Sequence, residues 1–187
     1  MRRRWFRMLD NVHVPGRWYL TDPTDIHGHD LWFAFVRGKR VPVEGAVTLK
    51  FNKHAPRGRR VDYSELSGES TPVVHVRVAE KLIEVAPSDV QIVPVSIPGE
   101  PDEFCLVNVV KVVKCINDEE SRYEYRDEDD SYRIMTTLRI DPARVQGTKI
   151  FRPLGWEVAI VVAEEVKEAL EQLGVVGVKF QDCTAGA

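Results

Sequence analysis

The last quarter of the chain carries the clearest hydrophobic periodicity. Residues 156–162 (WEVAIVV) form a short apolar run rich in β-branched side chains, which is typical of a largely buried strand. Within residues 164–173 the apolar side chains recur every three or four positions, which predicts an amphipathic helix that Gly174 would end. Apolar side chains then alternate over residues 176–180, as in a strand. We therefore expect a strand–helix–strand unit here.

The preceding three quarters of the chain predict more strands than helices. Apolar runs predict strands over residues 17–20, 31–36, 41–51, 90–97, 104–115 and 133–140. Residues 78–85 share one apolar face and predict a short helix. Because Pro94 cannot donate a ladder hydrogen bond, its strand should be an edge strand or carry a bulge. The elements predict an α+β fold with a mixed, mostly antiparallel sheet and a few helices, closing with the C-terminal strand–helix–strand unit.

The length of 187 residues and the 43% hydrophobic content favour one globular domain. We expect a basic N-terminal arm over residues 1–16, a single α+β domain over residues 17–182 and a tail over residues 183–187. The chain has no apolar run of about 18 residues that could form a transmembrane helix. Its start also lacks the apolar region of a secretory signal, so we expect a cytoplasmic protein.

The candidate chemistry of the chain is sparse. Cys105 and Cys115 lie in apolar runs and should pack as small hydrophobic residues, whereas Cys183 should lie in a frayed tail. A turn-rich loop holds possible metal ligands at Asp22, Asp25, His27, His29 and Asp30, but its spacing fits no known site, so we expect no metal. Phosphate-binding glycine loops and hydrolase motifs do not occur. We therefore expect no cofactor and no enzymatic activity.

Charge is distributed unevenly along the chain. Residues 1–60 carry a net charge of +8 and residues 61–187 a net charge of −11, although the whole chain has a net charge of −3. Such asymmetry can indicate a charged partner such as nucleic acid. Alternatively, the basic and acidic parts attract each other across a single fold. The sequence leaves both interpretations open.

Residues 118–130, which we call the acidic segment, are the most biased part of the chain. Their net charge is −6, and tyrosines lie among the acids. The candidate partner-binding residues are Asp118, Glu119, Glu120, Tyr123, Glu124, Tyr125, Asp127, Glu128, Asp129 and Asp130. One interpretation is a solvated hairpin loop, because runs of charge are commonly solvated. The other is an acidic surface with aromatic anchors that binds a basic partner.

Several stretches together resemble one known family. They are RWYL and DLWF near the start, TPVVHVRVAEKL and LVNVVKVVKCIN in the middle, and the long C-terminal stretch that contains IFRPLGW and AIVVAEEVKEAL. This pattern is similar to the predicted immunity proteins of bacterial polymorphic toxin systems, first described as a domain of unknown function in myxobacterial chains. The resemblance covers about residues 17–180, and the matching residues Trp18, Pro72, Asp141, Pro142, Gly155 and Trp156 look like scaffold.

The resemblance implies a non-enzymatic α+β protein that binds a cognate toxin encoded by a neighbouring gene. Such toxins are often delivered by type VI-like secretion and are often nucleases, whose basic clefts hold phosphates. A carboxylate-rich surface can fill such a cleft, so the acidic segment is the expected toxin-binding surface. The alternatives are a nucleic-acid-binding module that uses residues 1–60, or a small hydrolase with a hidden site. The oligomeric state stays open.

Overall fold

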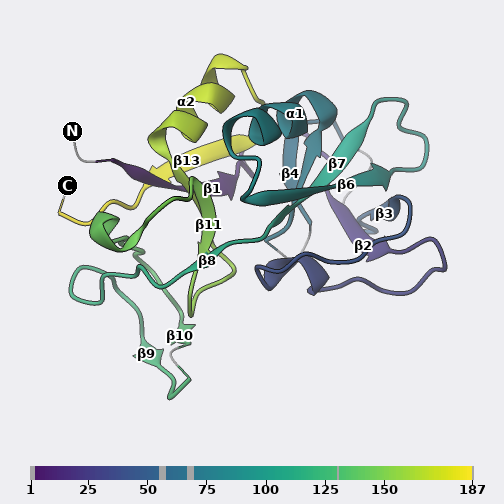
Figure 1. Cartoon of the computed structure of the whole chain (residues 1–187). Helices are drawn as coiled ribbons and strands as arrows, with labels where there is room; N and C mark the ends of the chain where they lie inside the picture. Colours follow the sequence, from purple (N-terminus) through teal and green to yellow (C-terminus); the bar gives the residue numbers. More distant parts are fainter. Residues whose placement is uncertain (1–2, 55–57, 67–69, 130, 187) are drawn as a thin grey trace.

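The computed structural model describes residues 3–54, 58–66, 70–129 and 131–186, which form two large β-sheets with a helix over each and a separate two-stranded hairpin (Figure 1). The five-stranded sheet has the order β13 (Val178–Asp182), β1 (Trp5–Asp10), β12 (Ile160–Ala163), β11 (Ile150–Pro153) and β8 (Val112–Val113). The six-stranded sheet has the order β2 (Leu20–Thr24), β3 (Val47–Phe51), β6 (Val90–Ser96), β7 (Phe104–Val109), β5 (Pro72–His75) and β4 (Tyr63–Glu65).

The remaining elements are a small hairpin and four helical segments. They are β9 (Tyr125–Arg126), β10 (Tyr132–Arg133), α1 (Val76–Val85), α2 (Glu164–Gln172) and the 3₁₀ helices η1 (Ala34–Val36) and η2 (Pro142–Arg144). In Figure 1 the two α-helices lie on one side of the sheets and the β9–β10 hairpin projects on the other. Most strand pairs are antiparallel, with β3–β6 and β8–β11 parallel, so the predicted α+β class is confirmed.

The C-terminal strand–helix–strand unit forms as predicted, with shifted strands. β12 begins at Ile160 rather than at position 156, because Trp156 lies in a turn and donates its N–H to the carbonyl of Pro153. In α2, Val166 and Leu170 are buried, and Gly174 follows the helix with a φ of 68°. The closing strand β13 does not pair with β12. β1 lies between them and pairs antiparallel with both.

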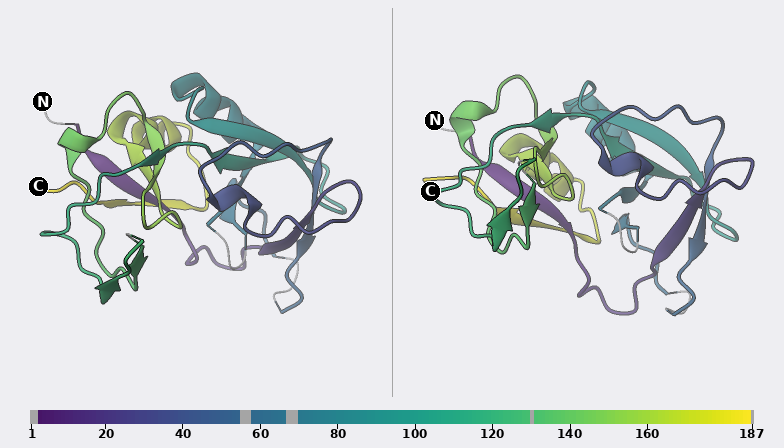
Figure 2. Two further views of the ribbon diagram at one scale, coloured as in Figure 1. Left: turned by 60° about the horizontal axis from the view of Figure 1, so that its bottom comes forward. Right: turned by 90° about the horizontal axis from the view of Figure 1, so that it is seen from below.

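Both ends of the chain contribute to the five-stranded sheet. Trp5 and Phe6, from the segment expected to be a basic arm, are buried side chains of β1. Cys183 is also buried, with 1% of its surface exposed, so its expected place in a frayed tail is wrong. Its backbone N–H donates to the carbonyl of Trp5 over 2.9 Å. Figure 2 shows both termini at the same end of the molecule. The division into arm, domain and tail stays a prediction.

Strands buried on both faces explain why parts of the sequence are apolar without alternation. In β12, Ile160 and Val162 face the central core under the helices, whereas Val161 and Ala163 face a second cluster below the sheet. That second cluster, which we call the outer core, contains Trp5 of β1 together with residues from the segments below the sheet. Because both faces of the strand are buried, both carry apolar residues. The alternation of apolar and polar residues that marks a half-buried strand is therefore absent.

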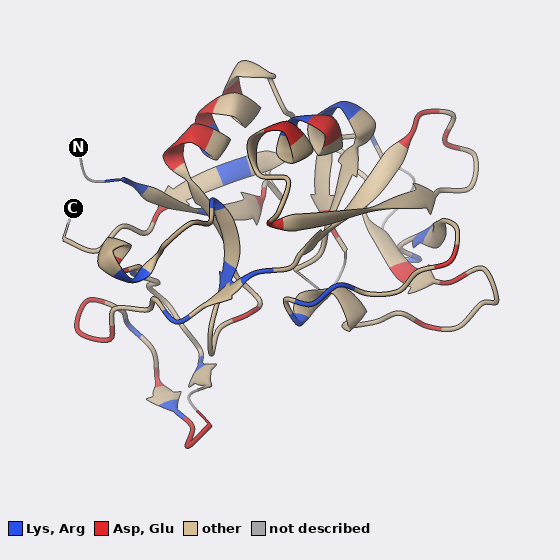
Figure 3. Ribbon diagram, in the orientation of Figure 1, with Lys and Arg blue, Asp and Glu red and all other residues tan. Residues whose placement is uncertain are grey.

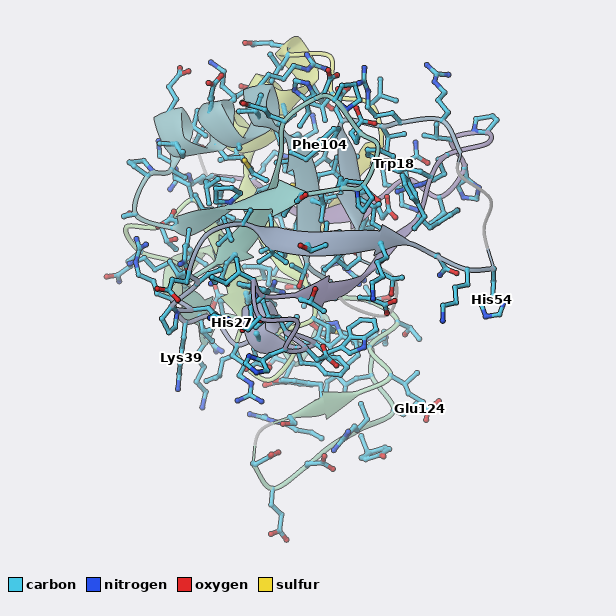
Figure 4. All side chains as sticks on the ribbon, turned by 90° about the vertical axis from the view of Figure 1, so that its right-hand side faces the viewer. Trp18, His27, Lys39, His54, Phe104 and Glu124 are labelled. Carbon is cyan, nitrogen blue, oxygen red and sulfur yellow. The ribbon has the colours of Figure 1, made fainter. Side chains whose placement is uncertain are left out.

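β7 follows the same rule in the six-stranded sheet. Cys105 and Val107 face the central core, and Phe104 and Leu106 face a third cluster on the other side of the sheet. In that cluster Phe104 and Trp18 pack edge to face, with ring centroids 5.1 Å apart (Figure 4). The prediction that Cys105 packs as a small hydrophobic residue is confirmed.

Five strand predictions are wrong in extent or type. Of the strand expected over residues 41–51, only β3 (Val47–Phe51) forms. Residues 104–115 form not one strand but two, because β7 belongs to the six-stranded sheet and β8 to the five-stranded sheet. Residues 31–36 contain η1 instead of a strand, residues 133–140 only the end of β10, and β2 begins at Leu20 and continues to Thr24 through the expected loop. In residues 31–36 and 133–140, the apolar side chains of Phe35, Met135 and Leu138 fill the clusters below the sheets without joining a ladder.

Two further expectations have mixed outcomes. The short helix predicted over residues 78–85 is α1, which starts two residues earlier at Val76. The strand with Pro94 is β6, which lies inside its sheet and is not an edge. Pro94 is tolerated there because β3 pairs only with Val95 and Ser96, the two residues that follow it.

Candidate functional site

The acidic segment is anchored to the sheet by the residues around it. It leads into the β9–β10 hairpin, which extends away from both sheets (Figure 1), and the acids concentrate at its loop and tip (Figure 3). Six neighbouring side chains are buried in the outer core: Cys115, Ile116, Tyr132, Met135, Leu138 and Ile140. The exposed charges are therefore presented on a backbone that the core holds in place.

Two acids of the segment fix the hairpin internally. Asp118 accepts a hydrogen bond from the hydroxyl of Tyr132 over 2.6 Å and lies 3.4 Å from the guanidinium of Arg126. Burial and this carboxylate both raise the pKa of the Tyr132 hydroxyl. Asp127 pairs with Arg133 of the facing strand at 2.7 Å. These carboxylates stabilise the hairpin and are less available to a partner.

Two more acids have local structural roles. Glu120 accepts hydrogen bonds from the side-chain amide of Asn117 at 3.0 Å and from the backbone N–H of Gly186 at 2.8 Å. Asp129 accepts a hydrogen bond from the backbone N–H of Ser131 at the hairpin tip, and this bond lowers the pKa of the Asp129 carboxyl. The hydrogen bonds of Glu120 and Asp129 therefore hold the local backbone conformation at the start of the acidic segment and at the hairpin tip.

Glu119, Glu124 and Glu128 differ from the other acids. All three are exposed, and no hydrogen bond or ion pair engages their carboxylates within the part of the chain that the structure describes. Figure 4 shows Glu124 on the side of the projecting hairpin. Asp130 lies outside the described residues. The three glutamates are the carboxylates of the segment that are free to meet a partner.

The two candidate tyrosines are not equivalent. Tyr123 is half-buried and packs edge to face against Tyr132, with ring centroids 4.8 Å apart, so its ring belongs mainly to the outer core. Tyr125 is 55% exposed. Of the two rings, that of Tyr125 is the one accessible for packing against another molecule.

An open groove of about 510 Å³ lies beside the hairpin, and sequence reasoning missed it. Its walls come from three distant segments: Val36, Arg37, Lys39, Tyr132, Arg133, Gly155, Trp156, Glu157 and Val158. Glu157 is the one carboxylate among these lining residues, and it accepts the backbone N–H of Gly155 at 2.9 Å. A pair of carboxylates for acid–base catalysis is therefore not present in this lining. No sequence spacing signals such a groove, because the fold assembles it.

The buried Arg152 supports the groove from behind. Its guanidinium donates to the backbone carbonyls of Glu157 at 2.6 Å and Phe35 at 3.2 Å, on opposite walls, and to the carbonyl of Ser70 at 2.9 Å. A planar guanidinium with several donors suits such a bridge between backbone segments. The relative position of the two walls is thereby fixed.

Much of the basic charge of the N-terminal third pairs with acids from distant segments. Arg3 pairs with Glu165, and Arg4 pairs with Asp182 and with Glu164. Arg60 similarly pairs with Glu100 and Asp102. For these residues the interpretation of mutual attraction across one fold is confirmed. Other exposed cations of this third have no side-chain partner among the described residues: Arg37, Lys39, Arg40, Lys50, Lys53 and Arg59.

The loop with two histidines is organised by its own aspartate. Asp25 accepts the backbone N–H groups of His27 and His29 at 2.8 Å each, and its second oxygen lies 2.9 Å from Nδ1 of His29. The described part of the chain contains no group of three or more possible metal ligands. The hydrogen bonds of Asp25 therefore explain the Asp and His residues of this loop as parts of a turn.

Most of the residues that carried the resemblance have scaffold roles. Trp18 is buried, and Pro72 begins β5. Asp141 caps η2 by accepting the backbone N–H of Ala143 at 3.0 Å, with Pro142 in its first turn. Within the described residues, the chain forms no helix that is long and apolar enough to span a membrane.

Comparison with known proteins gives one positive finding. Residues 35–185 match the model of the immunity protein family (Imm11). This match covers the hairpin, the residues that line the groove and every strand of the two large sheets except β1 and β2. A search of curated proteins found no match.

Proposed function

We propose that this chain, which belongs to the immunity protein family (Imm11), uses the acidic segment to bind and neutralise its cognate toxin. The observation that supports this use is that the carboxylates of Glu119, Glu124 and Glu128 are exposed and have no partner among the described residues. Glu119 lies in the turn before the β9–β10 hairpin, and the exposed ring of Tyr125 belongs to the same acidic segment. The chain acts by direct contact and without catalysis. It does so in the cytoplasm, without contact to membrane or nucleic acid.

The chemistry of the segment points to a nuclease-type toxin. A nuclease holds phosphates in a basic cleft, and the carboxylates of the acidic segment can occupy the same positions. Attraction between the two surfaces accelerates association, and the gain falls as salt screens the charges. Tyr125 adds buried area to the contact at low entropic cost.

Co-expression tests this function directly. The probe is the C-terminal domain of the protein encoded by the neighbouring gene, produced in bacteria with and without this chain. We expect growth arrest without the chain, rescue with it, and a complex that survives gel filtration. A nuclease identity further predicts degraded nucleic acid in the unprotected cells. Growth arrest that persists at full expression of the folded chain would contradict the proposal.

A matched pair of variants tests the surface. We expect Glu119→Gln, Glu124→Gln and Glu128→Gln together to weaken protection. The control replaces Glu80, Glu103 and Glu168 by Gln, because these exposed residues lie outside the hairpin and change the net charge equally. Equal protection by both triple variants would exclude the acidic segment as the toxin-binding surface.

A further inference from the structure

Two exposed apolar side chains flank the segments that line the groove, and both lie on unusual backbone. Phe33, just before η1, has a φ of 58° and is 54% exposed. Ile134, just after β10, has a φ of 48° and is 56% exposed. Left-handed backbone is rare and sterically unfavourable for bulky and β-branched residues. Asparagine or glycine would adopt this backbone more easily, so folding alone does not explain these side chains.

The lining of the groove carries positive charge that the chain does not neutralise. Arg37 and Lys39 line it, are exposed, and have no partner within the described ranges. Figure 4 shows Lys39 on the lower side of the molecule, the side on which the hairpin projects. The carboxylate of Glu157, which also lines the groove, accepts a hydrogen bond from the backbone N–H of Gly155, and it forms no ion pair with Arg37 or Lys39. An occupant that brings a carboxylate would therefore complement the groove.

The groove is also preorganised. Arg152 ties together the backbone on both walls, as described above. Gly38 lies so close to Val112 that a Cβ atom built on it would come within 2.1 Å of a Val112 methyl group. This close approach fixes the loop with Arg37 and Lys39 against β8. A fixed groove loses little conformational freedom when a ligand binds.

From these observations we infer that the groove is a second toxin-binding site, which takes a segment of the toxin with an apolar side chain next to a carboxylate. Val158 contacts the apolar side chain in the groove, and Arg37 and Lys39 bind the carboxylate. The same toxin surface extends over Phe33 and Ile134, the exposed side chains close in sequence to the lining residues Val36 and Arg133. The inference rests on the proposed function and extends it. Tyr132 and Arg133 belong both to the hairpin and to the groove lining, so one toxin domain can cover the two surfaces at once.

The two strained positions provide a test that separates binding from folding. Phe33→Asn and Ile134→Asn remove the apolar side chains and place a residue that tolerates the left-handed backbone. We expect the double variant to keep or raise the melting temperature. We expect its affinity for the C-terminal toxin domain encoded next door to fall at least about tenfold, mainly through faster dissociation. The control is Val12→Asn, an exposed apolar residue in the loop after β1 that is far in sequence from every residue of the groove lining, and it should leave affinity unchanged.

A charge variant keeps the test decisive if the double variant does not fold. Arg37→Gln with Lys39→Gln changes two exposed, unpaired side chains and should weaken binding by about three- to tenfold. Affinities within twofold of wild type for the folded variants would overturn the groove inference and leave the proposed function intact. No binding by the wild-type chain would overturn both. A wild-type dimer that the variants convert to monomers would overturn the inference by showing a second copy of the chain in the groove.

Discussion

The centre of the five-stranded sheet differs from the hairpin and groove at its periphery in how its residues are used. At its centre, β12 is buried along its whole length and faces the central core and the outer core alternately. At its periphery, the hairpin and groove leave Glu124, Glu128 and Arg37 without partners in the described structure and hold Ile134 exposed on left-handed backbone. The centre is explained by folding alone. The periphery is explained by binding, since groups without internal partners contribute little to stability.

The largest expected effect is at Arg152, which joins the two regions. Arg152→Met removes a buried guanidinium and leaves the carbonyls of Glu157, Phe35 and Ser70 without this donor. We expect the free energy of unfolding to fall by about 3–5 kcal/mol, measured by urea unfolding.

The matched control is Arg37→Met, at an exposed arginine that has no partner among the described residues. It should change the free energy of unfolding by less than about 0.5 kcal/mol. If both variants have the same stability, Arg152 does not hold the groove walls together.

The next effect concerns Glu65, a half-buried residue at the end of β4. Burial raises its pKa to about 7, although it also accepts a hydrogen bond from the hydroxyl of Tyr63 at 2.9 Å. Its pKa is higher in the folded than in the unfolded chain, so the folded state binds more protons between pH of about 4.5 and 7. Stability should therefore be lost as pH rises through this window.

Glu65→Gln isolates this contribution, because glutamine keeps an oxygen for the Tyr63 hydroxyl and cannot ionise. We expect the variant to be more stable than wild type by about 1–3 kcal/mol at pH 8 and nearly equal to it at pH 4.5. Urea unfolding across this pH range measures the difference. Glu168→Gln, at an exposed position of α2, should leave the pH profile unchanged. A difference independent of pH would mean that Glu65 does not titrate as stated.

A smaller effect distinguishes two tyrosines of the hairpin. Tyr132→Phe removes the hydrogen bond to Asp118 and should lower the free energy of unfolding by about 1–2 kcal/mol. Tyr125→Phe should leave it within about 0.5 kcal/mol, because Tyr125 is exposed. Thermal unfolding of the two variants makes the comparison. Equal losses would show that the hairpin is not organised around Tyr132.

The same contrast explains how much the sequence could predict. The C-terminal unit was predictable because periodicity and capping residues are local, and the acidic segment was recognisable because its charges are consecutive. The break between β7 and β8 was not, because both strands are apolar and only the tertiary fold assigns them to different sheets. The groove was hidden for a related reason: Arg37, Arg133 and Val158 are distant in the sequence.

The most direct test of the acidic segment is the association rate with the C-terminal toxin domain encoded next door, measured by stopped flow at low and at physiological salt. For the variant with glutamine at positions 119, 124 and 128, we expect an association rate constant about tenfold below wild type at low salt. We also expect a weaker dependence on salt. The control with glutamine at positions 80, 103 and 168 should retain the wild-type rate and salt dependence. Equal rates for the two triple variants would contradict the account.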